Sequence, residues 1–165
     1  MKILIAGYGR HGKDTVAELL AELGWSYISS SLHCAERAVR PAMEAIGIDY
    51  ASTEECFNDR ENHRAFWKHA ISEYNTPKDR LIKEILSEAD IYVGLRCREE
   101  FEAGRHLFDK VIWVDRSVKR PPDPSCDLRP WDADMIVDNN SGLLQLRRAV
   151  SQLDNDLQIL KGSKP

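Results

Sequence analysis

The feature of this sequence that most constrains its fold is a glycine-rich segment close to its beginning. The apolar, β-branched run Ile3–Ala6 predicts a buried β-strand, and the segment Gly7–Lys13 (GYGRHGK) follows it directly. From Lys13 to about Leu23, apolar residues recur at helical spacing, and Gly24 is a typical residue for ending a helix. The chain therefore opens with a strand, a tight turn and a helix, which is the repeating unit of α/β proteins.

The segment Gly7–Lys13 fits the pattern G-x-x-x-x-G-K, and it lies between a predicted strand and a predicted helix, as that motif requires. Backbone N–H groups of such a loop form an anion nest, and the helix that follows adds its positive end. Gly7 and Gly12 permit a close backbone approach, and Lys13 supplies a mobile charge for phosphates. The alternative is an ordinary glycine-rich connection. The candidate phosphate-binding residues are Gly7, Tyr8, Gly9, Arg10, His11, Gly12, Lys13, Asp14 and Thr15.

Asp14 stands where this motif normally has the Ser or Thr that holds Mg²⁺, and Thr15 comes directly after it. A carboxylate also holds Mg²⁺, either directly or through water. Asp14 and Thr15 are therefore both candidate metal ligands, and Thr15 is also a candidate phosphate contact. The alternative is that Asp14 is simply an acid in the first turn of a helix, where the helix dipole favours it.

Strand and helix patterns alternate along the rest of the chain. This order predicts an α/β fold of three layers, with a parallel sheet of about five strands and helices on both faces. The length fits a single domain, residues 1–165, with a tail at 161–165 that we expect to fray. Further strands are expected at 27–28, 91–94, 111–114 and 135–137, and further helices at 32–46 (bent by Pro41), 53–74, 77–88, 99–106 and 142–160.

Composition excludes several classes of protein. The formal net charge of −4 argues against a general basic clamp for nucleic acid, although a local basic patch is compatible with it. No apolar stretch approaches the roughly 20 residues of a membrane span, and no signal pattern precedes the first strand. The four cysteines form no C-x-x-C motif, which favours reduced thiols in a cytoplasm over a disulfide framework or a zinc site. We expect a cytoplasmic protein without a membrane partner, and an oligomer is possible.

Several segments resemble a known family. GKDT followed by a helix resembles the P-loop nucleotide kinases, and more narrowly the phage deoxynucleoside monophosphate kinases. The segments ECFNDRENHRAFW, EYN, DIYVGLR, VIWVD and DADMIVDNNSGLLQL together resemble the phage 5-hydroxymethyluracil DNA kinases, an offshoot of the thymidylate-kinase-like group. The resemblance implies a P-loop kinase fold, ATP and Mg²⁺ as cofactors, and the cytoplasm of a phage-infected host cell.

The activity that this resemblance implies is transfer of the γ-phosphate of ATP to the hydroxymethyl group of 5-hydroxymethyluracil in DNA, a step in thymidine hypermodification. DNA containing that base would be the partner, and a free deoxynucleoside monophosphate is the alternative acceptor. A P-loop ATPase or switch module is the competitor from another class. Such modules typically have a strand that ends in a metal-binding Asp followed by Glu or Gln, whereas IYVGLR ends in Arg96, which favours a kinase.

Acceptor-binding candidates lie in the segment DRENHR. If this segment is helical, Arg60 and Arg64 share one face, as do Asp59 and His63, and two guanidinium groups one turn apart can hold a phosphate. The resemblance implies that Asp59 accepts or orients the proton of the acceptor hydroxyl and that Arg60 holds a substrate phosphate. The alternative is a solvated helix face. Trp67 is expected in the core, with stacking on a base as the alternative.

Two arginines follow the strand expected at 91–94, and parallel sheets present ligands at this end of their strands. Arg96 is a candidate for stabilising charge on the transferred phosphoryl group, which places it with Lys13 and Asp59 in the candidate catalytic set. Arg98 is a candidate substrate-binding residue, or it pairs only with Glu102.

Residues 116–132 contain four prolines and several charges, which predicts an irregular segment. By resemblance, this insertion is a lid whose Arg116, Arg120 and Arg129 close over the phosphates, and a plain surface loop is the alternative. The same resemblance implies that the segment Asp138–Gly142 lies near the adenine, and the alternative is a polar turn that caps the last helix.

Overall fold

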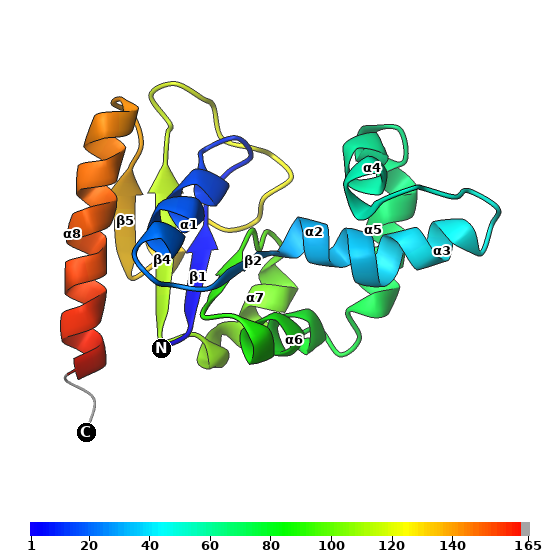
Figure 1. Ribbon diagram of the computed structural model, residues 1–165, viewed down its shortest axis with the longest axis horizontal. Coiled ribbons are helices and arrows are strands. Elements are labelled where there is room, and N and C mark those ends of the chain that lie inside the picture. The colour runs from blue at the N-terminus through cyan, green and yellow to red at the C-terminus, as the bar shows by residue number, and fades with distance from the viewer. Residues whose placement is uncertain (163–165) are drawn as a thin grey trace.

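The computed structural model of the chain, which describes residues 1–162, contains a five-stranded sheet with the strand order β2-β3-β1-β4-β5 (Figure 1). Every pair of neighbouring strands is parallel, as the alternation of strand and helix patterns predicted. The strands are β1 (Ile3–Ala6), β2 (Tyr27–Ser29), β3 (Ile91–Val93), β4 (Lys110–Asp115) and β5 (Met135–Asp138).

Helices cover both faces of the sheet, and the side chains of β1 show how the two faces are filled. Ile3 and Ile5 pack in a core with α1 (Lys13–Glu22) and α8 (Leu143–Gly162). Leu4 and Ala6 point to the other face, where α6 (Arg80–Glu88) and α7 (Arg98–Gly104) complete a second core. Because successive side chains of a strand alternate in direction, a strand buried on both faces is apolar throughout. The predicted three-layer α/β architecture is confirmed.

The chain between β2 and α6 forms a helical lobe, residues 30–74, which extends away from the sheet at the side opposite α8 (Figure 1). The lobe has a small core of its own, in which Met43 and Trp67 are buried. Trp67 therefore packs in a hydrophobic core, as expected. The helices of the lobe are α2 (Ser30–Cys34), a π-helical turn (Ala35–Val39), α3 (Arg40–Glu44), α4 (Thr53–Asn58) and α5 (Arg64–Tyr74).

The prediction of one long helix over residues 53–74 is wrong, because the helix is interrupted between α4 and α5. A 3-10 turn occupies Asp59–Glu61, and the backbone of His63 is not helical. The side chain of Asp59 accepts hydrogen bonds from Tyr50 and Asn62. Short polar side chains with such local partners compete with helix formation, which accounts for the break.

Smaller differences concern the ends of other helices. The helix expected at 77–88 begins at Arg80, because Pro77 belongs to a turn in which its carbonyl accepts from the Arg80 N–H. The helix expected at 32–46 ends at Glu44 and contains the π-helical turn ahead of Pro41, which occupies the first turn of α3. Residues 30–44 are thus one continuous helical segment, and the π-helical turn lies directly ahead of the proline, which has no N–H to donate to the preceding turn.

The predicted insertion 116–132 has neither helix nor strand over residues 116–129, and a 3-10 turn follows at Pro130–Asp132. The last helix, α8, includes Lys161 and Gly162 of the tail that was expected to fray, and residues 163–165 lie outside the described residues. Within residues 1–162, none of the helices is both long enough and apolar enough to cross a membrane.

Candidate active site

The backbone of the glycine loop needs glycine at two of the predicted positions. Gly7 has φ 149°, and a Cβ added to it would lie 2.7 Å from the carbonyl oxygen of Val114. Gly12 has φ 91°, and a Cβ there would collide with the side-chain amide of Asn139. L-residues rarely adopt such φ values, so both the backbone angle and the lack of space require glycine. The close backbone approach that an anion nest requires is therefore present, and such a nest would hold the phosphates of ATP.

Lys13 begins α1 and bends back over the loop. Its Nζ donates to the carbonyl oxygens of Gly7 and Tyr8, each at 2.9 Å. Only 7% of Lys13 is exposed, and burial, followed by the nearby charge of Arg96, lowers the pKa of its ammonium to about 8. A bound phosphate would place further negative charge beside this buried cation and favour its charged form.

Two contacts with distant segments fix the loop in place. Asn139, which is buried just beyond β5, donates from Nδ2 to the carbonyl oxygen of His11 at 2.9 Å. The His11 ring is buried as well, and its Nδ1 accepts from the backbone N–H of Arg116 at 3.0 Å. The side chain of His11 thus anchors the start of the irregular segment. Neither contact has a local sequence signal, although the segment Asp138–Gly142 was expected near the nucleotide.

A cavity of about 770 Å³ extends from the glycine loop to the helical lobe. Its walls come from the loop and α1, from the ends of β2 and β3, from the lobe and from residues 123–125. Candidate cationic residues from three separate segments of the sequence all line this cavity. The lining residues with polar or aromatic side chains include Arg10, Lys13, Asp14, Glu18, Tyr27, Ser29, Ser31, Phe57, Arg60, Glu61, Arg64, Trp67, Arg96, Asp123 and Ser125.

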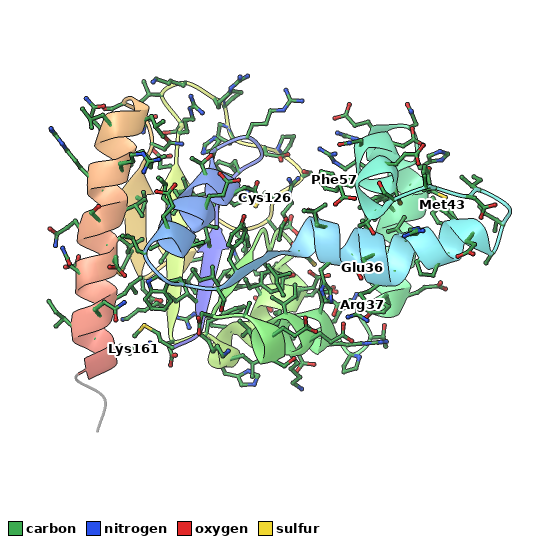
Figure 2. All side chains as sticks on the ribbon, viewed as in Figure 1. Glu36, Arg37, Met43, Phe57, Cys126 and Lys161 are labelled. Atoms are coloured by element: carbon green, nitrogen blue, oxygen red, sulfur yellow. The ribbon has the colours of Figure 1, made fainter. Side chains whose placement is uncertain are left out.

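The lobe presents an aromatic ring and two arginines to this cavity. The guanidinium group of Arg60 lies 4.0 Å from the centre of the Phe57 ring and donates to the Phe57 carbonyl oxygen at 2.8 Å. Arg64 is far more accessible, since 80% of its side chain is exposed. Phe57 lies on the side of the lobe that faces the sheet (Figure 2).

Asp59 and His63 do not line this cavity. The Asp59 carboxylate accepts from the Tyr50 hydroxyl at 2.7 Å, and His63 Nε2 lies 3.2 Å from it. Hydrogen bonds from Tyr50 and Asn62, followed by the charge of His63, hold the pKa of Asp59 below its usual range. The structure thus places both residues where they support the turn that carries Arg60.

Arg96 and Arg98 follow the same strand but have different surroundings. Arg96 Nη1 lies 3.2 Å from Asp123 Oδ2 and 3.3 Å from Ser125 Oγ, at the wall of the cavity. Arg98 forms a two-pronged ion pair with Asp132, with N–O distances of 2.8 and 2.7 Å. Arg98 therefore links the C-terminal end of the irregular segment to α7. Its main ion pair is with Asp132, not with Glu102.

The three arginines expected in a lid do not line the cavity. Arg129 donates to the carbonyl oxygens of Cys126 and Leu128, within its own segment. Arg116 provides the backbone N–H for His11, and Arg120 is exposed. The irregular segment contributes to the cavity through Asp123, Pro124 and Ser125.

Of the two candidate metal ligands, Asp14 lines the cavity and is exposed, whereas Thr15 is half-buried and does not line it. Within residues 1–162 there is no group of three or more His, Cys, Asp and Glu side chains that could hold a metal ion. Mg²⁺ bound with a nucleotide needs only one or two carboxylates, because phosphates and water complete its ligand shell. Asp14 fits that requirement.

No protein-family model and no curated protein sequence matches the chain. Among solved structures, it is similar to TT1252 from Thermus thermophilus, with 21% identity, a TM-score of 0.56, and coverage of 100% of this chain and 98% of that chain. It is also similar to shikimate kinase from Aquifex aeolicus, with 13% identity, a TM-score of 0.54 and 96% of each chain covered. Shikimate kinase from Acinetobacter baumannii, solved in complex with shikimate, has 16% identity and a TM-score of 0.52, with 99% and 95% covered. The chain therefore has the fold of P-loop kinases.

Proposed function

We propose that the protein is an ATP-dependent kinase. The observation that carries this proposal is the single cavity that joins the glycine loop and Lys13 to Arg96 and to the arginines of the lobe. The loop N–H groups and Lys13 would bind the phosphates, Asp14 would hold Mg²⁺, and Arg96 would face the charge that develops on the transferred group. ATP supplies the phosphoryl group in this chemistry, and Mg²⁺ neutralises its charge.

The acceptor that suits this cavity is an anion with a planar ring. Arg60, Arg64 and Arg96 provide three cationic side chains, and Phe57, one face of which the Arg60 guanidinium covers, provides an aromatic contact for a base. Trp67 also lines the cavity, but only 7% of it is exposed because it packs in the lobe core. A nucleotide has both a negative charge for these arginines and a planar ring for Phe57, whereas a neutral acceptor has no charge with which the arginines could pair.

We further propose that the nucleotide is 5-hydroxymethyluracil in DNA and that its hydroxymethyl oxygen accepts the phosphoryl group. The resemblance of the middle segments supports this choice. The exposure of Arg64 supports it too, because an accessible cation beside the cavity can reach a phosphate of the strand that flanks a flipped base. A free deoxynucleoside monophosphate is the second candidate, which the net charge of −4 favours.

A transfer assay with labelled ATP tests these proposals. The acceptors are DNA containing thymine, uracil or 5-hydroxymethyluracil, the free deoxynucleoside monophosphates, and shikimate as a small control acceptor. Label on DNA only when it contains 5-hydroxymethyluracil is the expected result. Label on a free monophosphate alone would overturn the DNA acceptor and leave the kinase. ATP hydrolysis that no acceptor stimulates would favour the ATPase or switch module.

A further inference from the structure

The side chain of Asp123, which belongs to the irregular segment 116–129, packs against the glycine loop. A Cβ added to Gly9 would lie 2.6 Å from Asp123 Oδ2 and would therefore overlap with it. The backbone N–H of Gly9 is close enough to this carboxylate to act on its pKa, which it lowers. Asp123 thus already lies beside a donor that such a loop otherwise offers to a phosphate.

The carboxylate also forms an ion pair with one cationic side chain of the site and lies near a second. Arg96 Nη1 lies 3.2 Å from Asp123 Oδ2, and the negative charge of Asp123 is close enough to act on the ammonium of Lys13. Ser125 orients the other carboxylate oxygen through its backbone N–H at 2.9 Å and its hydroxyl at 2.6 Å. Asp123 therefore contacts Arg96 and lies close to the glycine loop and Lys13, which are the three kinds of group that a terminal phosphate would meet.

The carboxylate is ionised at neutral pH. Burial acts to raise the pKa of Asp123, but the hydrogen bonds from Ser125, the charge of Arg96 and the N–H of Gly9 outweigh burial and hold the pKa below its usual range. A carboxylate and a phosphate cannot share these donors, because two anions at such short range repel each other.

We propose that the Asp123 carboxylate competes with the terminal phosphate of the nucleotide for the same binding groups. A triphosphate would therefore bind by displacing Asp123. Displacement would free Arg96 from its ion pair with Asp123, so that the arginine can turn to the transferred group. It would also lift residues 123–125 from the wall of the cavity that leads to the lobe. This inference rests on the proposed binding of nucleotide at the glycine loop, and it adds a regulatory contact that couples phosphate binding to Arg96.

Binding measurements test the inference without relying on turnover. The dissociation constants of a non-hydrolysable ATP analogue, of ADP and of adenosine are measured by calorimetry, with Mg²⁺ present, for the wild type and for Asp123→Asn, which preserves the shape of the side chain. We expect the variant to bind the triphosphate about tenfold more tightly, which corresponds to about 1.4 kcal/mol. The gain should be smaller for ADP and absent for adenosine.

Two further variants complete the design. Ser125→Ala removes the hydroxyl that orients the carboxylate, and it should give a smaller gain in the same direction. Asp127→Asn is the matched control, because Asp127 lies in the same segment, is exposed, and contacts Arg96 and Arg98 through its backbone. We expect Asp127→Asn to leave all three constants unchanged. Thermal unfolding of each variant establishes that folded proteins are compared. If Asp123→Asn does not fold, the triphosphate affinity of Ser125→Ala tests the inference in its place.

Each remaining outcome is decisive. If the wild type binds the triphosphate and Asp123→Asn binds it equally or more weakly, Asp123 is not a competitor, while nucleotide binding at the loop stands. An equal gain for adenosine would also overturn the inference, because adenosine carries no phosphate. Failure of the wild type to bind the triphosphate at all would overturn this inference and the proposed function together.

Discussion

The side-chain amide of Asn139 donates a 2.9 Å hydrogen bond to the carbonyl oxygen of His11, and it fills the space beside Gly12 that a methyl group would need. This contact joins the end of β5 to the glycine loop across 128 positions of sequence. Because Asn139 is buried, the loop conformation depends on a donor that water cannot easily replace.

Asn139→Ala should therefore reduce the stability of the protein. The substitution leaves the buried His11 carbonyl without this donor, so we expect the free energy of unfolding to fall by about 1–3 kcal/mol. Chemical denaturation monitored by circular dichroism measures it. Asn155→Ala, at an exposed position of α8, is the matched control and should change stability by less than about 0.5 kcal/mol. Equal stability of the two variants would mean that the Asn139 contact does not hold the loop.

The different surroundings of Arg96 and Arg98 predict different effects of the same substitution. Arg96→Ala should lower the rate of phosphoryl transfer by about 10²-fold or more, because an arginine that faces the transferred group acts mainly in the transition state. Arg98→Ala should leave the transfer rate within about threefold of the wild type. It should instead lower the free energy of unfolding by about 1 kcal/mol, since it breaks a partly exposed ion pair with Asp132.

Steady-state kinetics and denaturation of both arginine variants check this prediction, with each variant serving as the control for the other. A large loss of rate in Arg98→Ala, with wild-type kinetics in Arg96→Ala, would exchange their roles. That result would also return Arg98 to the substrate-binding set expected from the sequence.

Asp59 and Arg60 are adjacent, and their positions predict different kinetic signatures. Arg60 lines the cavity, so Arg60→Ala should raise the KM for the acceptor by roughly tenfold while the dissociation constant of ATP stays unchanged. Asp59 supports the turn that carries Arg60, so Asp59→Ala should raise the same KM by a smaller factor and leave kcat within about threefold. A kcat for Asp59→Ala that is lower by about 10²-fold or more would show that Asp59 acts on the reacting hydroxyl, as the resemblance implied.

The sheet and the glycine loop could be predicted from the sequence because each depends on residues that are close together in the chain. Strands such as β1 and β4 are buried on both faces and are therefore continuous apolar runs, and the loop is one short motif. The break at Asp59–His63 escaped prediction because the partners of Asp59, which are Tyr50 and Asn62, form no periodic pattern with it in the sequence.

The contacts that shape the site are harder to predict, because they pair residues far apart in the chain. Asp123 lies 27 positions from Arg96, and Asp132 lies 34 positions from Arg98. A carboxylate within an irregular segment has no periodic pattern, so nothing in the sequence separates Asp123 from Asp127. The sequence pointed to arginines as the residues through which this segment acts on the site, whereas the structure places an aspartate and a serine at the cavity wall.

The pKa of Lys13 gives a prediction about the pH dependence of stability. Burial and the charge of Arg96 lower this pKa from 10.5 to about 8, so the unfolded chain binds more protons than the folded protein between these two values. Stability therefore rises with pH across that interval, since the unfavourable burial of a charged lysine is present below about pH 8 and disappears as the folded lysine loses its proton. The rise attributable to Lys13 is on the order of 3 kcal/mol at most.

Comparison with Lys13→Met isolates this contribution, because methionine has a similar length and no charge. We expect the free energy of unfolding of the wild type to increase relative to Lys13→Met between pH 7 and pH 10.5, as measured by urea denaturation at several pH values. The same variant should lose phosphoryl transfer at every pH, because its loop retains the backbone donors but lacks the lysine charge. A constant stability difference across this range would show that the ammonium of Lys13 is not desolvated in the folded protein. Transfer at the wild-type rate would show that phosphates are not held at this loop.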